Sequence, residues 1–405
     1  MNSVKAVDLG TAFIVGITSD VSGKNVIRSV RNCFVDLDDL NVDINWVKEN
    51  TPANIVQIQD DDGNISSFII GDEAINLPIG KVRRPMKSGL VNPNEDLAIT
   101  IISKIIEMVI GPSDFPGQIV CYSSPAATSD NKLDPVNHSR IAKKIFEDLG
   151  YEAIEISEAL AVIYANCPKV IDENGKEYLF SGIGLSFGGG MCNITHTYLG
   201  IPTPELTFSL PRSGDWIDNR VSESMGDKEN GDPRFSPSYI SGFKERYLDL
   251  LKEDYTDAEL IGFGFTSGNR RKDFRKIHFA LRSYYEDLIN FSIASFCDKF
   301  KKSRVESDYA VEIVISGGTS LPHGFPEKFD AILRERGDFP FEISRVRRAE
   351  DPLNATCLGA LTKAKSEAKK RLKNSASEEH QNGNKKQHTK KTTNQESVEN
   401  DETKD

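Results

Sequence analysis

Residues 182–198 read GIGLSFGGGMCNITHTY, in which an apolar run meets three consecutive glycines and a second run returns from Ile194. Short apolar runs bounded by glycine predict buried strands, and two such runs around a tight turn predict a hairpin. Residues 4–18 read VKAVDLGTAFIVGIT and have the same order of strand, glycine turn and strand. A unit that occurs twice predicts two similar halves, which we expect to face each other across a cleft.

Strands alternate with helices after each hairpin. The spacing predicts helices over residues 97–110, 137–149 and 158–165, strands over 118–122 and 153–156, then a long helix over 273–301, a buried strand over 311–316 and a final helix over 354–368. We expect Asn92 or Asn94 to cap the first helix and Gly150 to close the second. The alternation favours an α/β fold with mostly parallel strand pairing. The sequence up to about residue 90 and over 217–275 is polar and turn-rich.

This pattern divides the chain into two lobes, a returning helix and a tail. We expect a first lobe over 1–155 with an inserted subdomain at about 32–90, a second lobe over 156–345 with an inserted subdomain at about 217–275, a helix over 346–369 that returns to the first lobe, and a tail over 370–405. The tail is so polar that it cannot bury enough apolar surface to offset the entropy of ordering. We predict that it is disordered, either a solvating end or a tether to a partner protein or a membrane.

The composition excludes several classes of protein. A chain of 405 residues is long enough for two or three domains. It has no run of about 18 apolar residues, which argues against a membrane span, and the strand-like run from Val4 leaves no space for an apolar signal sequence. A formal net charge of −11 disfavours direct binding of nucleic acid. Six cysteines without a CxxC pair and six histidines without an HxxxH pattern predict reduced thiols, no zinc site and a cytoplasmic location.

The turn after the first strand, Asp8-Leu9-Gly10-Thr11, has the chemistry of a phosphate site. A strand that ends in glycine presents successive backbone N–H groups outward and forms a concave anion site. An aspartate beside a phosphate is repulsive unless a cation lies between them, so Asp8 predicts Mg²⁺, bound directly or through water. An ordinary hairpin turn is the alternative for this motif taken alone.

Two further glycine turns follow apolar strands. Each of the three glycines at 188–190 lowers the stability of the folded protein by up to ~1 kcal/mol relative to alanine. Such a cost is understandable where a ligand approaches the main chain closely. In Ser316–Leu321, a buried strand opens into two glycines and a short helix, which suits a planar base or a phosphate. A flexible bend is the alternative for either turn. No Walker loop is present, since Gly23-Lys24 lacks the leading glycine and is followed by Asn25, and no GxGxxG follows a strand.

These pieces, in this order, resemble the actin superfamily, closest in motif pattern to prokaryotic actins of the MreB and MamK type. The similar segments are Asp8–Thr11 (first phosphate loop), Glu158–Ala165 (first connecting helix), Gly188–Gly190 (second phosphate loop), Ser213–Asp218 (a Gly-Asp-x-x-Asp motif), Ser316–Ser320 (adenosine loop), Gly359-Ala360 (final connecting helix) and Arg84–Leu90, which is similar to a segment of MreB and MamK.

The resemblance implies a two-lobed fold of duplicated ribonuclease-H-like domains, with ATP or ADP and Mg²⁺ in the cleft between them. Asp8 would hold Mg²⁺ or its water, and Glu158 would orient the attacking water. The alternative for Glu158 is a capping or solvated glutamate. The implied nucleotide contacts are Gly10, Thr11, Ala12, Gly188, Gly189, Gly190, Gly214, Asp215, Gly317, Gly318 and Thr319.

The sequence departs from the family pattern at the second phosphate loop. Ser186 stands where the family has aspartate, and Asn193 occupies a position that is often Asp or His. Loss of one preorganised catalytic contact lowers a rate by ~10²–10³. We therefore predict that ATP binds and is hydrolysed slowly. Val15 stands where actin has a lysine, and MreB-like members also lack this lysine.

The resemblance implies a cytoskeletal protein that forms nucleotide-dependent filaments by head-to-tail self-association. A non-polymerising nucleotide switch or adaptor is the alternative, favoured by Ser186. A chaperone-like or sugar-kinase-like enzyme is a third hypothesis. The chain has no large C-terminal substrate domain for a chaperone and no clear catalytic aspartate for a kinase.

Overall fold

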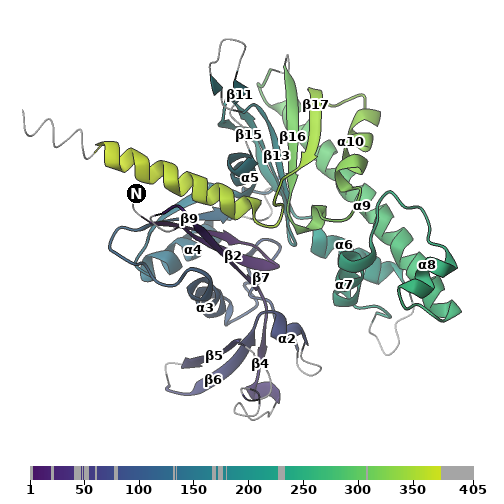
Figure 1. The fold of residues 1–405 in the computed structure, drawn as a ribbon, viewed down its shortest axis with the longest axis horizontal. Coiled ribbons are helices and arrows are strands. Elements are labelled where there is room, and N and C mark those ends of the chain that lie inside the picture. Colours follow the sequence, from purple (N-terminus) through teal and green to yellow (C-terminus); the bar gives the residue numbers. More distant parts are fainter. Residues whose placement is uncertain are drawn as a thin grey trace, which may run out of the picture.

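The computed structural model has two lobes, each built on a five-stranded sheet (Figure 1). It describes residues 3–19, 22–40, 47, 49, 54–59, 62–76, 81–130, 133, 135–166, 170–171, 177–178, 180–226, 233–306 and 309–374. Among these residues, no helix combines the length and the apolar content that crossing a bilayer needs.

The sheet of the first lobe has the strand order β10-β9-β1-β2-β3. Its strands are β1 (Val4–Leu9), β2 (Phe13–Ser19), β3 (Asn25–Arg31), β9 (Ile119–Ser124) and β10 (Glu152–Ser157). The β1–β2 and β2–β3 pairs are antiparallel, and the β1–β9 and β9–β10 pairs are parallel. Alternate residues of β1 face opposite cores: Val7 packs with α3 (Ala98–Ile110) and α4 (Val136–Asp148), whereas Ala6 packs with the final helix (residues 355–374).

The sheet of the second lobe repeats this arrangement strand for strand. Its order is β15-β14-β13-β16-β17. Its strands are β13 (Gly182–Phe187), β14 (Cys192–Tyr198), β15 (Ile201–Leu210), β16 (Ala310–Ser316) and β17 (Glu342–Arg348). Again the first three strands pair antiparallel and the last two join in parallel. The predicted duplication and the α/β, two-lobed fold are confirmed.

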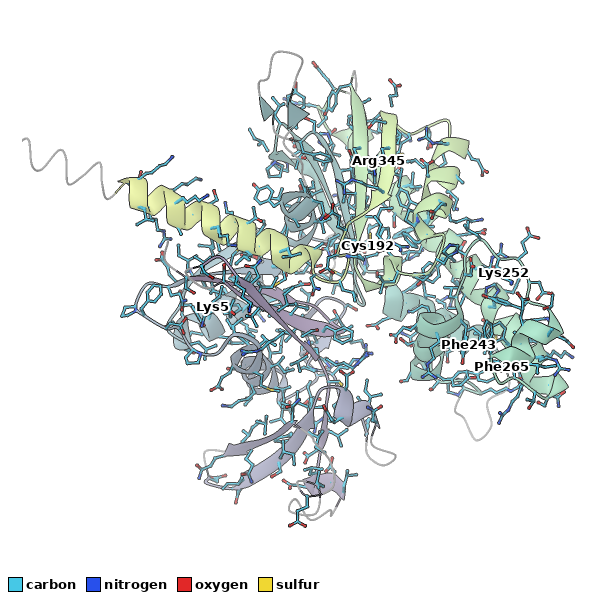
Figure 2. All side chains as sticks on the ribbon, viewed as in Figure 1. Lys5, Cys192, Phe243, Lys252, Phe265 and Arg345 are labelled. Carbon is cyan, nitrogen blue, oxygen red and sulfur yellow. The ribbon has the colours of Figure 1, made fainter. Side chains whose placement is uncertain are left out.

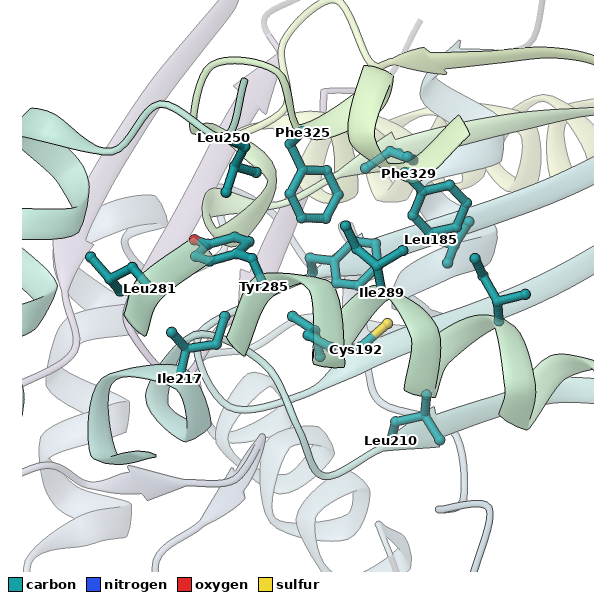
Figure 3. Packing of buried hydrophobic residues seen from close by; sticks show 14 of the residues in the cluster. Leu185, Cys192, Leu210, Ile217, Leu250, Leu281, Tyr285, Ile289, Phe325 and Phe329 are labelled. Atoms are coloured by element: carbon teal, nitrogen blue, oxygen red, sulfur yellow. The ribbon is translucent and has the colours of Figure 1, made fainter. Parts of the chain in front are cut away.

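Helices α9 (Gly268–Lys302) and α10 (Phe325–Glu335) pack against the second sheet. Helices α6 (Gly214–Ser224) and α7 (Pro237–Tyr247) pack against α9, and the short α8 (Asp257–Gly262) lies beside α7 (Figure 1). Together these helices and the sheet form the largest hydrophobic core of the described residues. Figure 3 shows Tyr285 and Ile289 of α9 packed among Phe325, Phe329 and Cys192. In the region around α7 and α8, where Figure 2 labels Phe243 and Phe265, both rings pack against Phe274, the first tilted and the second edge-on.

Shorter elements surround the first lobe. A three-stranded sheet has the order β4-β6-β5. The elements are β4 (Phe34–Asp36), the 3-10 turn η1 (Asp38–Leu40), β5 (Asn54–Gln59), β6 (Ile65–Ile70), α2 (Asp72–Asn76), and the pair β7 (Met86–Lys87) and β8 (Leu90–Val91). A second small pair, β11 (Val170–Ile171) and β12 (Glu177–Tyr178), precedes β13 and lies beside the sheet of the second lobe instead (Figure 1).

Two helices connect the lobes and touch each other. Helix α5 (Glu158–Asn166) starts directly after β10 and packs against the second sheet through Val162 and Ile163. The final helix crosses α5 at Gly359, where a Cβ atom would overlap the carbonyl oxygen of Ala161. The chain therefore passes between the lobes at a crossing that only glycine permits.

Several local predictions need correction. The residue at the N-cap of α3 is Leu97, without a side-chain cap, so the predicted cap at Asn92 or Asn94 is wrong. The polar segments before residue 90 and over 217–275 contain β3 to β6 and helices α6 to α8. Strand β3 was missed because it is exposed along most of its length and shows no alternation of burial. The final helix extends to residue 374, and the rest of the predicted tail lies outside the described residues.

Candidate functional site

A cavity of about 380 Å³ is lined by the turns that follow β1, β13 and β16, so that residues of both lobes contribute to it. All the predicted catalytic and nucleotide-contact residues line this one cavity: Asp8, Gly10, Thr11, Ala12, Glu158, Gly188, Gly189, Gly190, Gly214, Asp215, Gly317, Gly318 and Thr319. Residues more than 300 positions apart in the chain therefore share one site.

The first glycine turn is held from behind by side chains. The hydroxyl of Ser123 donates to Asp8 Oδ1 at 2.6 Å and accepts from the backbone N–H of Leu9 at 3.2 Å. Asn32 donates its side-chain amide to the carbonyl of Gly10 at 3.0 Å and its backbone N–H to that of Ala12 at 2.9 Å. These bonds fix the turn and the direction of the Asp8 carboxylate.

The second and third glycine turns are tied together through the carbonyl of Gly188. It accepts from Ser213 Oγ at 2.6 Å, Thr319 Oγ1 at 2.7 Å and the N–H of Gly214 at 3.3 Å. Gly317 has a φ of +91°, and a Cβ atom there would overlap the carbonyl of Phe187. The third turn therefore packs directly on the end of β13, and its close approach requires glycine.

The lobes touch at the cavity through the segment Arg84–Leu90. Thr11 Oγ1 accepts from the N–H of Gly89 at 2.9 Å, and a Cβ atom on Gly190 would lie 2.5 Å from both groups. Arg84 Nη1 pairs with Asp215 Oδ1 at 3.0 Å, which joins the first lobe to α6 of the second. The predicted ligand contact Asp215 thus has a protein partner in this structure.

Two carboxylates line the cavity: Asp8, which is half-buried, and Glu158, which is buried. Burial raises the pKa of Asp8 to about 6 against the opposing hydrogen bond from Ser123. Burial, and then the nearby Asp8 charge, raise the pKa of Glu158 well above its ordinary value of 4.5. A divalent cation would relieve this accumulation of negative charge, and carboxylate oxygens are ligands that Mg²⁺ accepts. The residues present therefore fit a cation held by Asp8.

The departures from the family pattern lie side by side. Ser186 of β13 and Asn193 of β14 are direct partners in the antiparallel register, and both are buried. Asn193 Nδ2 donates to Glu158 Oε2 at 2.7 Å, and Ser209 Oγ donates to Asn193 Oδ1 at 2.5 Å. Glu158 is therefore neither a helix cap in solvent nor a free side chain.

The sequence analysis missed several residues that line the cavity, among them Arg31, Ser241, Lys244 and Glu245. Lys244 of α7 pairs with Asp218 at 2.7 Å, and both side chains are less than one tenth exposed. One available signal was helical spacing, because Ile240, Phe243 and Lys244 share the buried face of α7.

Comparisons with known proteins agree with this architecture. The model of the volactin family matches residues 3–364. The actin-like protein MamK of Paramagnetospirillum magneticum (strain ATCC 700264 / AMB-1) is 22% identical over 303 residues, which cover 73% of this chain and 79% of MamK. A solved MamK double helical filament superposes with a TM-score of 0.60 at 18% identity, covering 90% of this chain and 98% of that one. A non-polymerising MamK mutant bound to AMPPNP gives a TM-score of 0.46 at 18% identity, covering 90% and 99%. The filament superposition confirms the actin-like fold.

Proposed function

The chain belongs to the volactin family, and on that premise we propose that it is an actin-like cytoskeletal protein that binds ATP or ADP with Mg²⁺ and forms nucleotide-dependent filaments. The observation that carries the proposal is the convergence of three glycine turns and the two carboxylates of Asp8 and Glu158 on one cavity. Its volume of about 380 Å³ falls within the roughly 300–1,000 Å³ of small-molecule sites.

Each wall of the cavity has a proposed role. The turns at Gly10–Ala12 and Gly189-Gly190 donate backbone N–H groups to the phosphates, whereas the N–H of Gly188 closes its own turn on the carbonyl of Met191. Asp8 holds Mg²⁺ or its water. When bound, Mg²⁺ would neutralise phosphate charge. Gly317–Thr319 border the nucleoside, and Gly214 with Asp215 form the wall on the second lobe. Lys244 is fixed by Asp218 beside this wall.

We propose that hydrolysis is slow. We assign to Glu158 the role of polarising the attacking water. Its raised pKa means that its carboxylate binds a proton strongly. Ser186 offers no second carboxylate beside it, so one electrostatic contact of the family pattern is missing.

Filament formation is the finer part of the proposal. One solved structure with the same fold is a double helical filament of MamK, and head-to-tail contacts of identical subunits give open filaments. The proposal also includes a cytoplasmic location, the two-lobe division near residue 156, and a tail beyond the final helix, over residues 375–405, that is available to protein partners. A nucleotide switch that does not polymerise is the second candidate, favoured by Ser186.

The first experiment measures nucleotide binding by the purified full chain, with a fluorescent ATP analogue and with or without Mg²⁺. Asp8→Asn should weaken binding in Mg²⁺ by roughly 10- to 100-fold. Glu107→Gln is the matched control, because Glu107 is an exposed acid of the same lobe, outside the cavity. Equal affinity of both variants and the unaltered protein would refute the assigned site.

The second experiment is sedimentation and electron microscopy with ATP, with ADP and without nucleotide. A pellet of filaments that requires nucleotide supports the cytoskeletal function. Tight nucleotide binding without any polymer, across salt and crowding conditions, would instead support the switch.

A further inference from the structure

We propose that Asn193, fixed by Ser209, is a positioning residue that orients the carboxylate of Glu158 toward the attacking water. The inference rests on the proposed nucleotide hydrolysis and assigns a function to a position where the chain departs from its family pattern.

Three residues from three elements form a buried relay. Glu158 begins α5, Asn193 lies on β14, and Ser209 is the register partner of Asn193 on β15. Ser209 Oγ donates to Asn193 Oδ1 at 2.5 Å, and Asn193 Nδ2 donates to Glu158 Oε2 at 2.7 Å. Asn193 is 2% exposed and Ser209 is fully buried, so water does not compete with these bonds. The relay therefore fixes a side chain of the connecting helix relative to the sheet of the second lobe.

Only one orientation of the Asn193 amide satisfies both hydrogen bonds of the relay. A carboxylate only accepts hydrogen bonds, whereas an amide has one donating and one accepting side and a hydroxyl can donate. Turning the Asn193 amide over would place its carbonyl against the Glu158 carboxylate. The observed orientation therefore supports the ionised form of Glu158, which burial opposes. Among the described residues, Oε1 of Glu158 has no hydrogen-bond partner, and the side chain lines the cavity.

The substitution Asn193→Asp distinguishes the positioning role from the alternative, in which Asn193 merely replaces a lost ligand of the cation, because the two predict opposite effects on hydrolysis. Asn193→Asp would place a second carboxylate in contact with Glu158, and two carboxylates at such a distance share a proton. Glu158 would then be a poorer base, and hydrolysis would slow. If Asn193 merely replaces a lost ligand of the cation, restoring the acid would accelerate hydrolysis.

The experiment measures kcat and KM for phosphate release, and nucleotide affinity at equilibrium, with the purified full chain. We expect Asn193→Asp and Asn193→Leu to lower kcat by roughly 10- to 100-fold and to change affinity less than about twofold. Ser209→Ala, which removes one hydroxyl and threatens folding least, should lower kcat several-fold. Thermal unfolding followed by circular dichroism identifies any variant that does not fold.

The outcomes separate this inference from the proposed function. Unchanged kcat in folded Ser209→Ala and Asn193→Leu would overturn the relay, as would a faster Asn193→Asp. Nucleotide binding without any phosphate release by the unaltered protein would also overturn the relay, while nucleotide binding and filament formation would stand. Absence of nucleotide binding would overturn the proposed function itself.

Discussion

The two glycine hairpins occupy equivalent places in the two sheets and differ in charge. Asp8 and Ser186 are both the last residue but one of the first strand of their sheet, and each is followed by an apolar residue and glycine. In the antiparallel register Asp8 lies opposite Val15, whereas Ser186 lies opposite Asn193. The first hairpin thus contributes a carboxylate to the cavity, and the second hairpin contributes neutral hydrogen-bonding groups and bare main chain. Duplicated folds can divide the chemistry of one site between their halves.

The largest effect should come from the bare main chain of the second half. Gly317→Ala places a methyl group against the carbonyl of Phe187 in a residue whose φ is +91°. Strain and overpacking together should lower the free energy of unfolding by about 3–4 kcal/mol. Gly318→Ala is the matched control, because its nearest neighbour would be 3.7 Å away. Urea unfolding of both variants checks this, and equal stability would contradict it.

The next effect tests the missing charge directly. Ser186→Asp gives the second half the carboxylate that Asp8 gives the first, and phosphate release should accelerate by about 10²-fold. Steady-state phosphate release measures it. A rate equal to that of the unaltered protein would mean that the asymmetry between the halves has no catalytic consequence.

The charge of the first half should make stability depend on pH when nucleotide is absent. Asp8 has a pKa of about 6 in the folded protein against an ordinary value of 3.8, so the folded state holds a proton that the unfolded chain releases. Protonation of Asp8 therefore contributes fully to the free energy of unfolding below pH 4. This contribution falls by about 2 kcal/mol as the pH rises toward 6. Asp8→Asn should abolish this part of the slope. Urea unfolding of both proteins from pH 4 to 7 measures the difference, and parallel curves would contradict the prediction.

The smallest effect should come from the ion pair that joins the halves at the cavity. Arg84 and Asp215 are 42% and 33% exposed, so Arg84→Ala should cost only about 0.2–1 kcal/mol of stability. Its salt dependence should be measurable by thermal unfolding in low and high salt. Lys104→Ala, which breaks a comparable exposed pair within α3, is the control. A loss above about 2 kcal/mol would show that the pair holds the lobes together.

The positions of main-chain sites could be predicted from the sequence, because they leave a local signature. The turns at Gly10, Gly188 and Gly317 each follow an apolar run, and the repeated hairpin predicted two halves that face each other. The convergence of all three turns on one site was implied by the resemblance to the actin superfamily. The antiparallel start of each sheet followed in the same way.

Contacts between side chains from distant segments could not be predicted, because no local pattern records them. Arg84 and Asp215 are 131 residues apart, and Ser123 is 115 residues from Asp8. Asn193 was noticed as a departure, but its bonds to Glu158 and Ser209 exist only once β14, β15 and α5 have packed. The edge strand β3 was missed for a different reason, since exposure on both faces removes the alternation that identifies a strand.

The crossing of α5 and the final helix determines how the molecule can move. Gly359 and Ala161 approach so closely that a methyl group would not fit between them. Such a narrow contact resists sliding of the two helices past each other more than it resists rotation of one helix on the other. We expect rotation of one half about this pivot to disturb the cores of the two lobes less than sliding would, although it must change the contacts of Gly89 with Thr11 and of Arg84 with Asp215. Displacements grow in proportion to the distance from a pivot. They would therefore be greatest at the far ends of the molecule, around β5 and α8 (Figure 1).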